Sequence, residues 1–276
     1  MINMMKIILN WIISSNIFVA TCVLLLFKSS EILLGIENSH LNKFVFFATL
    51  FTYNFQRIIK EKRRSTKLNN YENWQIRNKN TAYLIIIISL IFMIFNFYYF
   101  KPSTQILIII SGTLAILYPF GLREVPFIKI YLITLIWTIA TMLLLIVEND
   151  LTFSKSIILH LFIRLSFVFA ITIPFDIRDQ MFDSKKIKSI PIIYGRKKAI
   201  LIGVVSLFSA IIFGIIQSIY FDMPYPYLIG LITVFILSIS LIKKSTEYKN
   251  PLFFSFCVES LSAFHYLFLI LSTLLL

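Results

Sequence analysis

The chain has 276 residues, of which 58% are hydrophobic and only 14% are charged, and its mean hydropathy is +0.86. Soluble domains carry about 25% charged residues, so this composition excludes a soluble protein. The net charge of +13 does not indicate nucleic acid, because basic residues between apolar runs are typical of cytoplasmic loops of membrane proteins. Cys22 and Cys257 both lie inside apolar runs, which argues against a disulfide framework or a cysteine metal site.

The long apolar runs predict membrane-spanning helices, since about 20 apolar residues cross a bilayer and the runs are too continuous for barrel strands. The first run carries Asn10 and Asn16 and lacks a small-residue cleavage site, so we expect a retained helix rather than a signal peptide. No second domain is visible, which predicts a single integral-membrane domain over residues 1–276. Nine spans are predicted, near residues 5–27, 43–60, 81–100, 103–120, 126–147, 155–175, 199–220, 226–243 and 252–275.

The basic residues are divided unevenly between the two sides that nine spans define. The N-terminus and the connections after the second, fourth, sixth and eighth spans hold most of the 26 Lys and Arg residues. The opposite side holds only Lys28, Lys43, Lys101 and Lys155, and Arg164 falls within a span. Because cytoplasmic loops are enriched in Lys and Arg, we expect a bacterial inner-membrane protein with its N-terminus in the cytoplasm and its C-terminus outside.

Three acids gather where the sixth span ends on the basic side. Asp176, Asp179 and Asp183 are spaced by three and four residues, which places them on one face of a continued helix. Hard divalent cations neutralise such a cluster, and Mg²⁺ binds one or two carboxylates together with substrate phosphates. The alternative is a solvated loop whose acids pair with neighbouring cations, namely Arg178, Lys185, Lys186 and Lys188. Spacing by itself does not separate these interpretations.

Two stretches of the chain match the pattern of a known membrane-protein family. The three acids are followed by Ser189-Ile-Pro191 and Tyr194-Gly195. Residues 118–129 read Tyr-Pro-Phe-Gly-Leu-Arg-Glu-Val-Pro-Phe-Ile-Lys. The first stretch resembles the second aspartate motif of the UbiA superfamily of intramembrane prenyltransferases, and the second is similar to the family's junction between the fourth and fifth helices. The resemblance implies an all-α, nine-helix membrane bundle in which Mg²⁺ bridges aspartates to a prenyl diphosphate.

The resemblance also implies roles for residues on the basic side. The three acids Asp176, Asp179 and Asp183 are expected to bind Mg²⁺ and to act in catalysis. Tyr118, at the end of the fourth span, is expected to contact the diphosphate or the allylic carbon, and an interfacial belt tyrosine is the alternative. Cations of both stretches are expected to bind the substrate: Arg123, Lys129, Arg178 and Lys186.

The first aspartate motif departs from the family pattern Asn-Asp-x-x-Asp-x-x-x-Asp. Asn54, Arg57 and Glu61 stand at the three acid positions, so one acid remains. Asn54 offers a neutral oxygen to a cation, whereas Arg57 would repel one. A guanidinium is a good bidentate partner of phosphate, so we expect Arg57 to hold the diphosphate in place of a metal ion, with Asn54 and Glu61 also on the substrate side. The alternative is that Arg57 only neutralises the Asp176 cluster.

Further polar residues lie inside and between the spans. His160 and Arg164 share one face of the sixth span, where they would line an acceptor cavity, pair with Glu259 or pack together. Residues 56–80 form the longest hydrophilic stretch. We interpret this stretch either as a lid over the diphosphate or as a polybasic patch on anionic lipid headgroups.

These patterns predict an enzyme that transfers a prenyl group from an isoprenoid diphosphate to a hydrophobic aromatic or lipid acceptor, with no nucleic-acid partner. The alternative function is non-catalytic binding of an isoprenoid diphosphate by a protein of the same fold. A solute transporter is a third interpretation, but it predicts an inverted repeat, and no obvious repeat is present in the sequence.

Overall fold

The computed structural model describes residues 2–63, 74–122, 125–181, 187–221 and 223–276, and all regular structure in these ranges is helical. Ten long helical segments follow one another. The short helix α4 (Trp74–Arg77) and the 3₁₀ turn η1 (Tyr118–Phe120) connect some of them. The long segments are α1 (Ile2–Ser14), α2 (Ile17–Leu34), α3 (Ser39–Arg63), α5 (Lys79–Phe97), α6 (Pro102–Leu117), α7 (Ile128–Thr138) continued by the π-helix η3 (Ile139–Leu143) and α8 (Leu144–Glu148), α9 (Lys155–Asp179), α10 (Ile190–Tyr220), α11 (Tyr225–Lys243), and the π-helix η4 (Phe253–Val258) continued by α12 (Ser260–Thr273).

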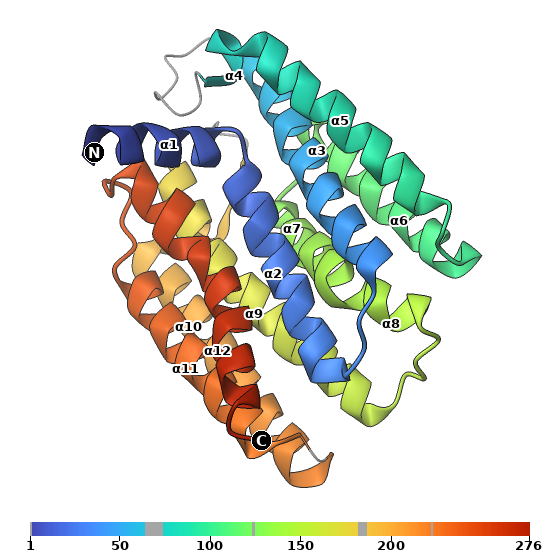
Figure 1. Cartoon of the computed structure of the whole chain (residues 1–276). Helices are drawn as coiled ribbons and strands as arrows, with labels where there is room; N and C mark the ends of the chain where they lie inside the picture. Colours follow the sequence, from blue (N-terminus) through green and yellow to red (C-terminus); the bar gives the residue numbers. More distant parts are fainter. Residues whose placement is uncertain (1, 64–73, 123–124, 182–186, 222) are drawn as a thin grey trace.

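The first predicted span, residues 5–27, is wrong because the chain changes direction after Ser14. Asn16 adopts the left-handed conformation with a φ of 65°, and α2 begins at the next residue. Asparagine visits this region more readily than most residues. Figure 1 shows α1 lying across one end of the bundle while α2 runs along it. The described ranges therefore contain ten long helical segments rather than nine, and the first of them that is long and apolar enough to cross a membrane is α2.

The other predicted spans all form helices, with some ends displaced. Eight helical segments of the described chain are long and apolar enough to cross a membrane. α3 is too polar to be counted with them, but it packs between α2 and α5, which are among the eight. α10 (Ile190–Tyr220) is interrupted at Gly195, whose φ of 80° and ψ of 158° are not helical, so its long part begins after Gly195 and the basic residues that precede 199 lie in its first turn.

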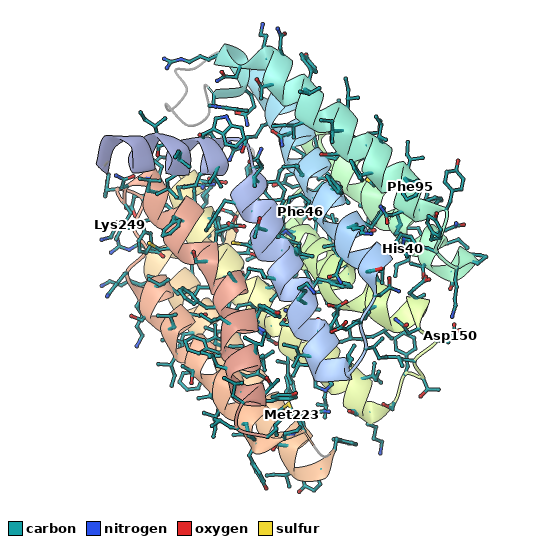
Figure 2. The ribbon with its side chains drawn as sticks, in the orientation of Figure 1. His40, Phe46, Phe95, Asp150, Met223 and Lys249 are labelled. Atoms are coloured by element: carbon teal, nitrogen blue, oxygen red, sulfur yellow. The ribbon has the colours of Figure 1, made fainter. Side chains whose placement is uncertain are left out.

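The helices alternate in direction along the bundle. Figure 1 shows that the C-terminal ends of α3, α6 and α9 lie at the same end as α1 and the N-terminal ends of α5, α7 and α10. Lys249, in the connection before η4, also lies at this end, and Met223 lies at the opposite end (Figure 2). The connections that sequence analysis places on one side are therefore together at one end, called the basic end below.

α9 is the most enclosed of the spanning helices. In its most apolar 18-residue window 61% of the residues are buried, compared with 17% for the α5 span and 11% for the α6 span. The exposed residues of α5 are mostly large and apolar, including Ile91 and Phe95, which suits contact with lipid. The acidic motif therefore stands at the end of a helix that other helices surround.

Candidate active site

The last turns of α9 carry the first two acids of the predicted motif. Asp176 is fully buried and Asp179 is 8% exposed, and their three-residue spacing directs both side chains to one face of the helix. Pro174 lies inside this helix, where it removes one backbone hydrogen bond without ending the helix. The two acids are therefore enclosed by the bundle, and the alternative of a solvated loop is wrong for them.

Lys129 bridges the two carboxylates from α7. Its Nζ atom lies 2.9 Å from Oδ1 of Asp176 and 2.8 Å from Oδ2 of Asp179. Lys129 belongs to the first turn of α7 and is 5% exposed, so solvent ions screen these pairs little. A cation thus lies between two carboxylates that a divalent ion would otherwise neutralise.

Arg178 lies at the solvent border of the same cluster. Its Nη2 and Nε atoms lie 2.8 Å and 2.9 Å from Oδ1 of Asp179. The guanidinium carbon is 5.2 Å from the ring centroid of Phe175 and 5.7 Å from that of Phe254, which is a cation–π arrangement. Because its side chain remains 29% exposed, Arg178 presents charge both to Asp179 and to the basic end.

The two family-like stretches of the sequence contact each other at the basic end. The Phe127 N–H donates to the carbonyl of Lys188 at 3.0 Å, and the rings of Phe127 and Tyr194 stack with centroids 6.1 Å apart. Gly195 has a φ of 80° and a ψ of 158°, a conformation that is costly for any residue with a Cβ atom. This glycine lets the chain turn from the Tyr194 contact into the long part of α10. The two stretches therefore form one site.

The residues of the predicted first motif contact the break between α1 and α2. Asn54 Nδ2 donates to the Ser15 carbonyl at 3.0 Å, and Arg57 Nη1 donates to the Ser14 carbonyl at 3.2 Å. Gln75 Nε2 also donates to the Ser14 carbonyl, at 2.8 Å. Carbonyls at a helix end lack intrahelical partners, so these side chains stabilise the break. Oδ1 of Asn54 is buried and has no hydrogen-bond partner among the described residues.

An aromatic and acidic group lies next to Arg57. Tyr53 and Trp137 pack against the same apolar cluster, the Tyr53 hydroxyl lies within electrostatic range of Arg57 and Glu259, and η1, which begins with Tyr118, contacts α3. The structure thus places Tyr118 beside the first-motif helix α3. Glu259 was not predicted as a site residue, although an ionisable residue inside an apolar run is a signal for one.

Some predicted site residues lie outside the described residues, namely Arg123, Asp183 and Lys186. The side chain of Glu61, near the end of α3, is also outside them, as are residues 64–73 of the predicted lid or polybasic patch. In the described part of the chain no three His, Cys, Asp or Glu residues gather in a way that would hold a metal ion. The described candidates for metal ligands are therefore Asp176 and Asp179.

His160 and Arg164 contact neighbouring helices instead of Glu259. Nη2 of Arg164 donates to the hydroxyls of Ser29 and Ser30 on α2, at 2.7 Å and 2.8 Å. His160 contacts a glutamine side chain of α10. No described carboxylate forms an ion pair with Arg164. Among the alternatives given for these two residues, the pair with Glu259 is therefore wrong, and the two residues join α9 to α2 and α10.

Residues 75–268 match the sequence model of the UbiA prenyltransferase family. The matched range includes both family-like stretches and Glu259, and it begins C-terminal to Asn54, Arg57 and Glu61. No curated protein matches the chain by sequence.

Several solved structures share the fold. The apo structure of a UbiA homologue from Aeropyrum pernix K1 aligns with a TM-score of 0.66 at 9% identity, covering 93% of this chain and 97% of that one. A UbiA homologue from Archaeoglobus fulgidus bound to GPP and Mg²⁺ aligns with a TM-score of 0.64 at 13% identity, covering 95% and 99%. A structure described as digeranylgeranylglyceryl phosphate synthase aligns with a TM-score of 0.57 at 17% identity, covering 95% and 98%.

Proposed function

Because the chain belongs to the UbiA prenyltransferase family, we propose that it transfers a prenyl group from an isoprenoid diphosphate to a hydrophobic aromatic or lipid acceptor in the membrane. The observation that carries the proposal is the cluster of Asp176, Asp179, Lys129 and Arg178 enclosed at one end of an apolar bundle. Ionisable groups are expensive to place in such a bundle, and they usually mark a functional site. Homologues of similar fold have been solved bound to GPP and Mg²⁺ and to DMAPP and Mg²⁺.

Asp176 and Asp179 fit a magnesium ion by their donor chemistry. Both are buried carboxylates on one helix face, and Mg²⁺ uses one or two carboxylates together with phosphate oxygens. We assign these two residues, and Asp183 after them, as the ligands that hold Mg²⁺. When bound, the ion supplies positive charge that stabilises the diphosphate as a leaving group.

The cations of the site stabilise the same leaving group. In the reaction the allylic C–O bond breaks, the electron pair leaves with pyrophosphate, and the acceptor attacks the allylic cation. The Lys129 ammonium and the Arg178 guanidinium lie beside Asp179, so they are positioned to stabilise charge that develops on the phosphate. Arg57 contributes a second guanidinium from α3, about one helical turn after Asn54, whose Oδ1 atom is buried. We place Arg123, Lys186 and Glu61 on the substrate side as well.

The apolar bundle suits a prenyl chain and a hydrophobic acceptor. The site lies at the basic end, so we propose that this end faces the cytoplasm and receives a soluble diphosphate head, while the tail extends between the helices. Tyr118 is the aromatic residue that we assign to the allylic carbon, since an aromatic face stabilises a cation without attacking it.

Non-catalytic binding of an isoprenoid diphosphate is the second candidate function. It is favoured by Arg57, which stands at an acid position of the family pattern and donates to the Ser14 carbonyl at 3.2 Å. A basic residue there lowers the number of metal ligands and leaves a site able to retain a diphosphate.

The experiment is pyrophosphate release by the purified protein in nanodiscs. Geranyl, farnesyl and geranylgeranyl diphosphate are offered with and without Mg²⁺, and with hydroquinone, 4-hydroxybenzoate or a monoalkyl glyceryl phosphate lipid as acceptors. Mg²⁺-dependent release that requires an acceptor and is lost in Asp176→Asn would support prenyl transfer. Donor binding without release across the panel would favour the binding protein, and neither binding nor release would contradict both functions.

A further inference from the structure

Glu259 lies inside the bundle near its basic end. It follows the π-helix η4 and precedes α12. Its backbone N–H donates to the carbonyl of Phe254, five residues earlier, at 3.2 Å. Such π turns are rare in proteins, and those that do occur are frequently found at functional sites. The Glu259 side chain is directed into the protein, since the residue is only 8% exposed.

Polar and charged groups of three other helices are close enough to the Glu259 carboxyl to influence it electrostatically. Those within electrostatic range are the Cys22 thiol on α2, the Tyr53 hydroxyl and the Arg57 guanidinium on α3, and the Arg178 guanidinium on α9. Arg57 belongs to the first-motif side of the proposed site, and Arg178 belongs to the aspartate side. The contacts of Phe254 place Glu259 beside the aspartate side, because the Arg178 guanidinium lies 5.7 Å from the Phe254 ring centroid and the Phe254 carbonyl accepts the Glu259 N–H at 3.2 Å.

The Glu259 carboxyl lacks the partners that buried carboxylates normally have. Its Oε1 atom is buried without a hydrogen-bond partner, and no ion pair of this side chain occurs among the described residues. Glu31 offers a comparison within the same chain, because it is 5% exposed but bonds the Asn38 N–H and the Asn42 side chain at 2.8 Å each and pairs with Lys28 at 3.5 Å. Burial alone therefore does not explain why Glu259 is unpartnered.

Prenyl transfer requires a proton acceptor as well as a leaving-group site. When the allylic carbon forms a bond to a ring carbon or a hydroxyl oxygen, that atom loses its hydrogen as a proton, and pyrophosphate has already left with the electron pair of the broken C–O bond. A carboxylate within reach of the reacting atoms takes up this proton. We propose that the Glu259 carboxylate is the catalytic base that accepts the proton lost by the prenyl acceptor, a role that rests on the proposed function.

The two described aspartates of the proposed site are less suited to this role. Asp176 and Asp179 share the Lys129 ammonium at 2.9 Å and 2.8 Å, and Asp179 also pairs with Arg178 at 2.8 Å. Ion pairs at these distances stabilise the ionised form and weaken a carboxylate as a base. Glu259 has no such pair at contact distance, so its oxygens are available to a substrate proton.

The test compares Glu259→Gln and Glu259→Asp with the parent in nanodiscs. The matched control is Glu247→Gln, because Glu247 pairs with Arg196 at 3.5 Å just outside the membrane-spanning helices. Geranyl diphosphate binding in the presence of MgCl₂ and single-turnover product formation are measured separately, with the acceptor that gives turnover in the parent.

We expect Glu259→Gln to bind geranyl diphosphate as the parent does but to form product about 100-fold more slowly or worse, the usual contribution of a general base. Glu259→Asp should recover part of the rate, and Glu247→Gln should match the parent. Undiminished product formation by Glu259→Gln would overturn the role of Glu259 but leave the proposed function intact. A loss of donor binding as large as the loss of rate would have the same consequence. Absence of turnover in the parent with every donor and acceptor would overturn the proposed function and this role together.

Discussion

Replacing Lys129 by methionine should destabilise the protein far more than removing a surface ion pair. The substitution keeps most of the side-chain volume but removes an ammonium that lies 2.9 Å from Asp176 and 2.8 Å from Asp179. The side chains of Lys129 and Asp176 are only 6% and 1% exposed, so bulk water does not replace the lost charge. Breaking a buried ion pair by removing one partner costs about 3–5 kcal/mol, which corresponds to a fall in Tm on the order of 10 °C.

The assay for this prediction is thermal unfolding in detergent without divalent cations, followed by circular dichroism. Lys101→Met is the matched control, because Lys101 pairs with the exposed Asp150 and such surface pairs contribute about 0–1 kcal/mol. Adding MgCl₂ should restore part of the lost Tm in Lys129→Met, since the ion replaces the missing positive charge. The reasoning would be refuted if Lys129→Met unfolded at the same temperature as Lys101→Met.

Three further substitutions test other parts of the structure. Gly230→Ala should lower the free energy of unfolding by about 1–3 kcal/mol, because the new Cβ would lie 2.6 Å from Ser272 Oγ and 2.9 Å from the Phe268 carbonyl oxygen. The control in the same thermal assay is Gly112→Ala, whose new Cβ meets no atom within 4 Å. Gly195→Ala should lower the free energy of unfolding by about 1–3 kcal/mol through backbone strain alone, since Gly195 has a φ of 80° and no atom lies within 4 Å of the added Cβ. An unchanged Tm would contradict this prediction. Arg57→Asp should raise the Mg²⁺ concentration needed for half-maximal geranyl diphosphate binding, because Mg²⁺ must then supply the positive charge that Arg57 provides to the diphosphate. A lower Tm with unchanged Mg²⁺ dependence would instead indicate that Arg57 only neutralises the Asp176 cluster.

The main features of the bundle could be predicted from local sequence patterns. Hydropathy identifies a spanning helix from the residues of that helix alone, because burial in lipid depends on each side chain separately. The alternation of Lys and Arg between successive connections then orders the helix ends, and the structure places these connections at one end. The spacing of Asp176 and Asp179 predicts a shared face for the same reason, since it depends only on the period of one helix.

Hydropathy failed where a helix breaks without a change in apolar character. The residues around Ser14 and Asn16 are surrounded by apolar neighbours, so the sequence reads as one span. The break is stabilised by side chains from far along the chain, since Asn54, Arg57 and Gln75 bond the Ser14 and Ser15 carbonyls. A window of consecutive residues contains no information about such partners.

The sequence by itself determined the class of protein, the basic end and the identity of the acidic motif. The tertiary structure alone decided that Lys129, separated from Asp179 by 50 positions, bridges the aspartates. It also decided that Arg164 bonds α2 instead of Glu259, and that the buried Oε1 atom of Glu259 has no hydrogen-bond partner among the described residues. The physical reason is that charge pairing depends on distances of a few ångströms between helices, and these distances are set by how the helices pack.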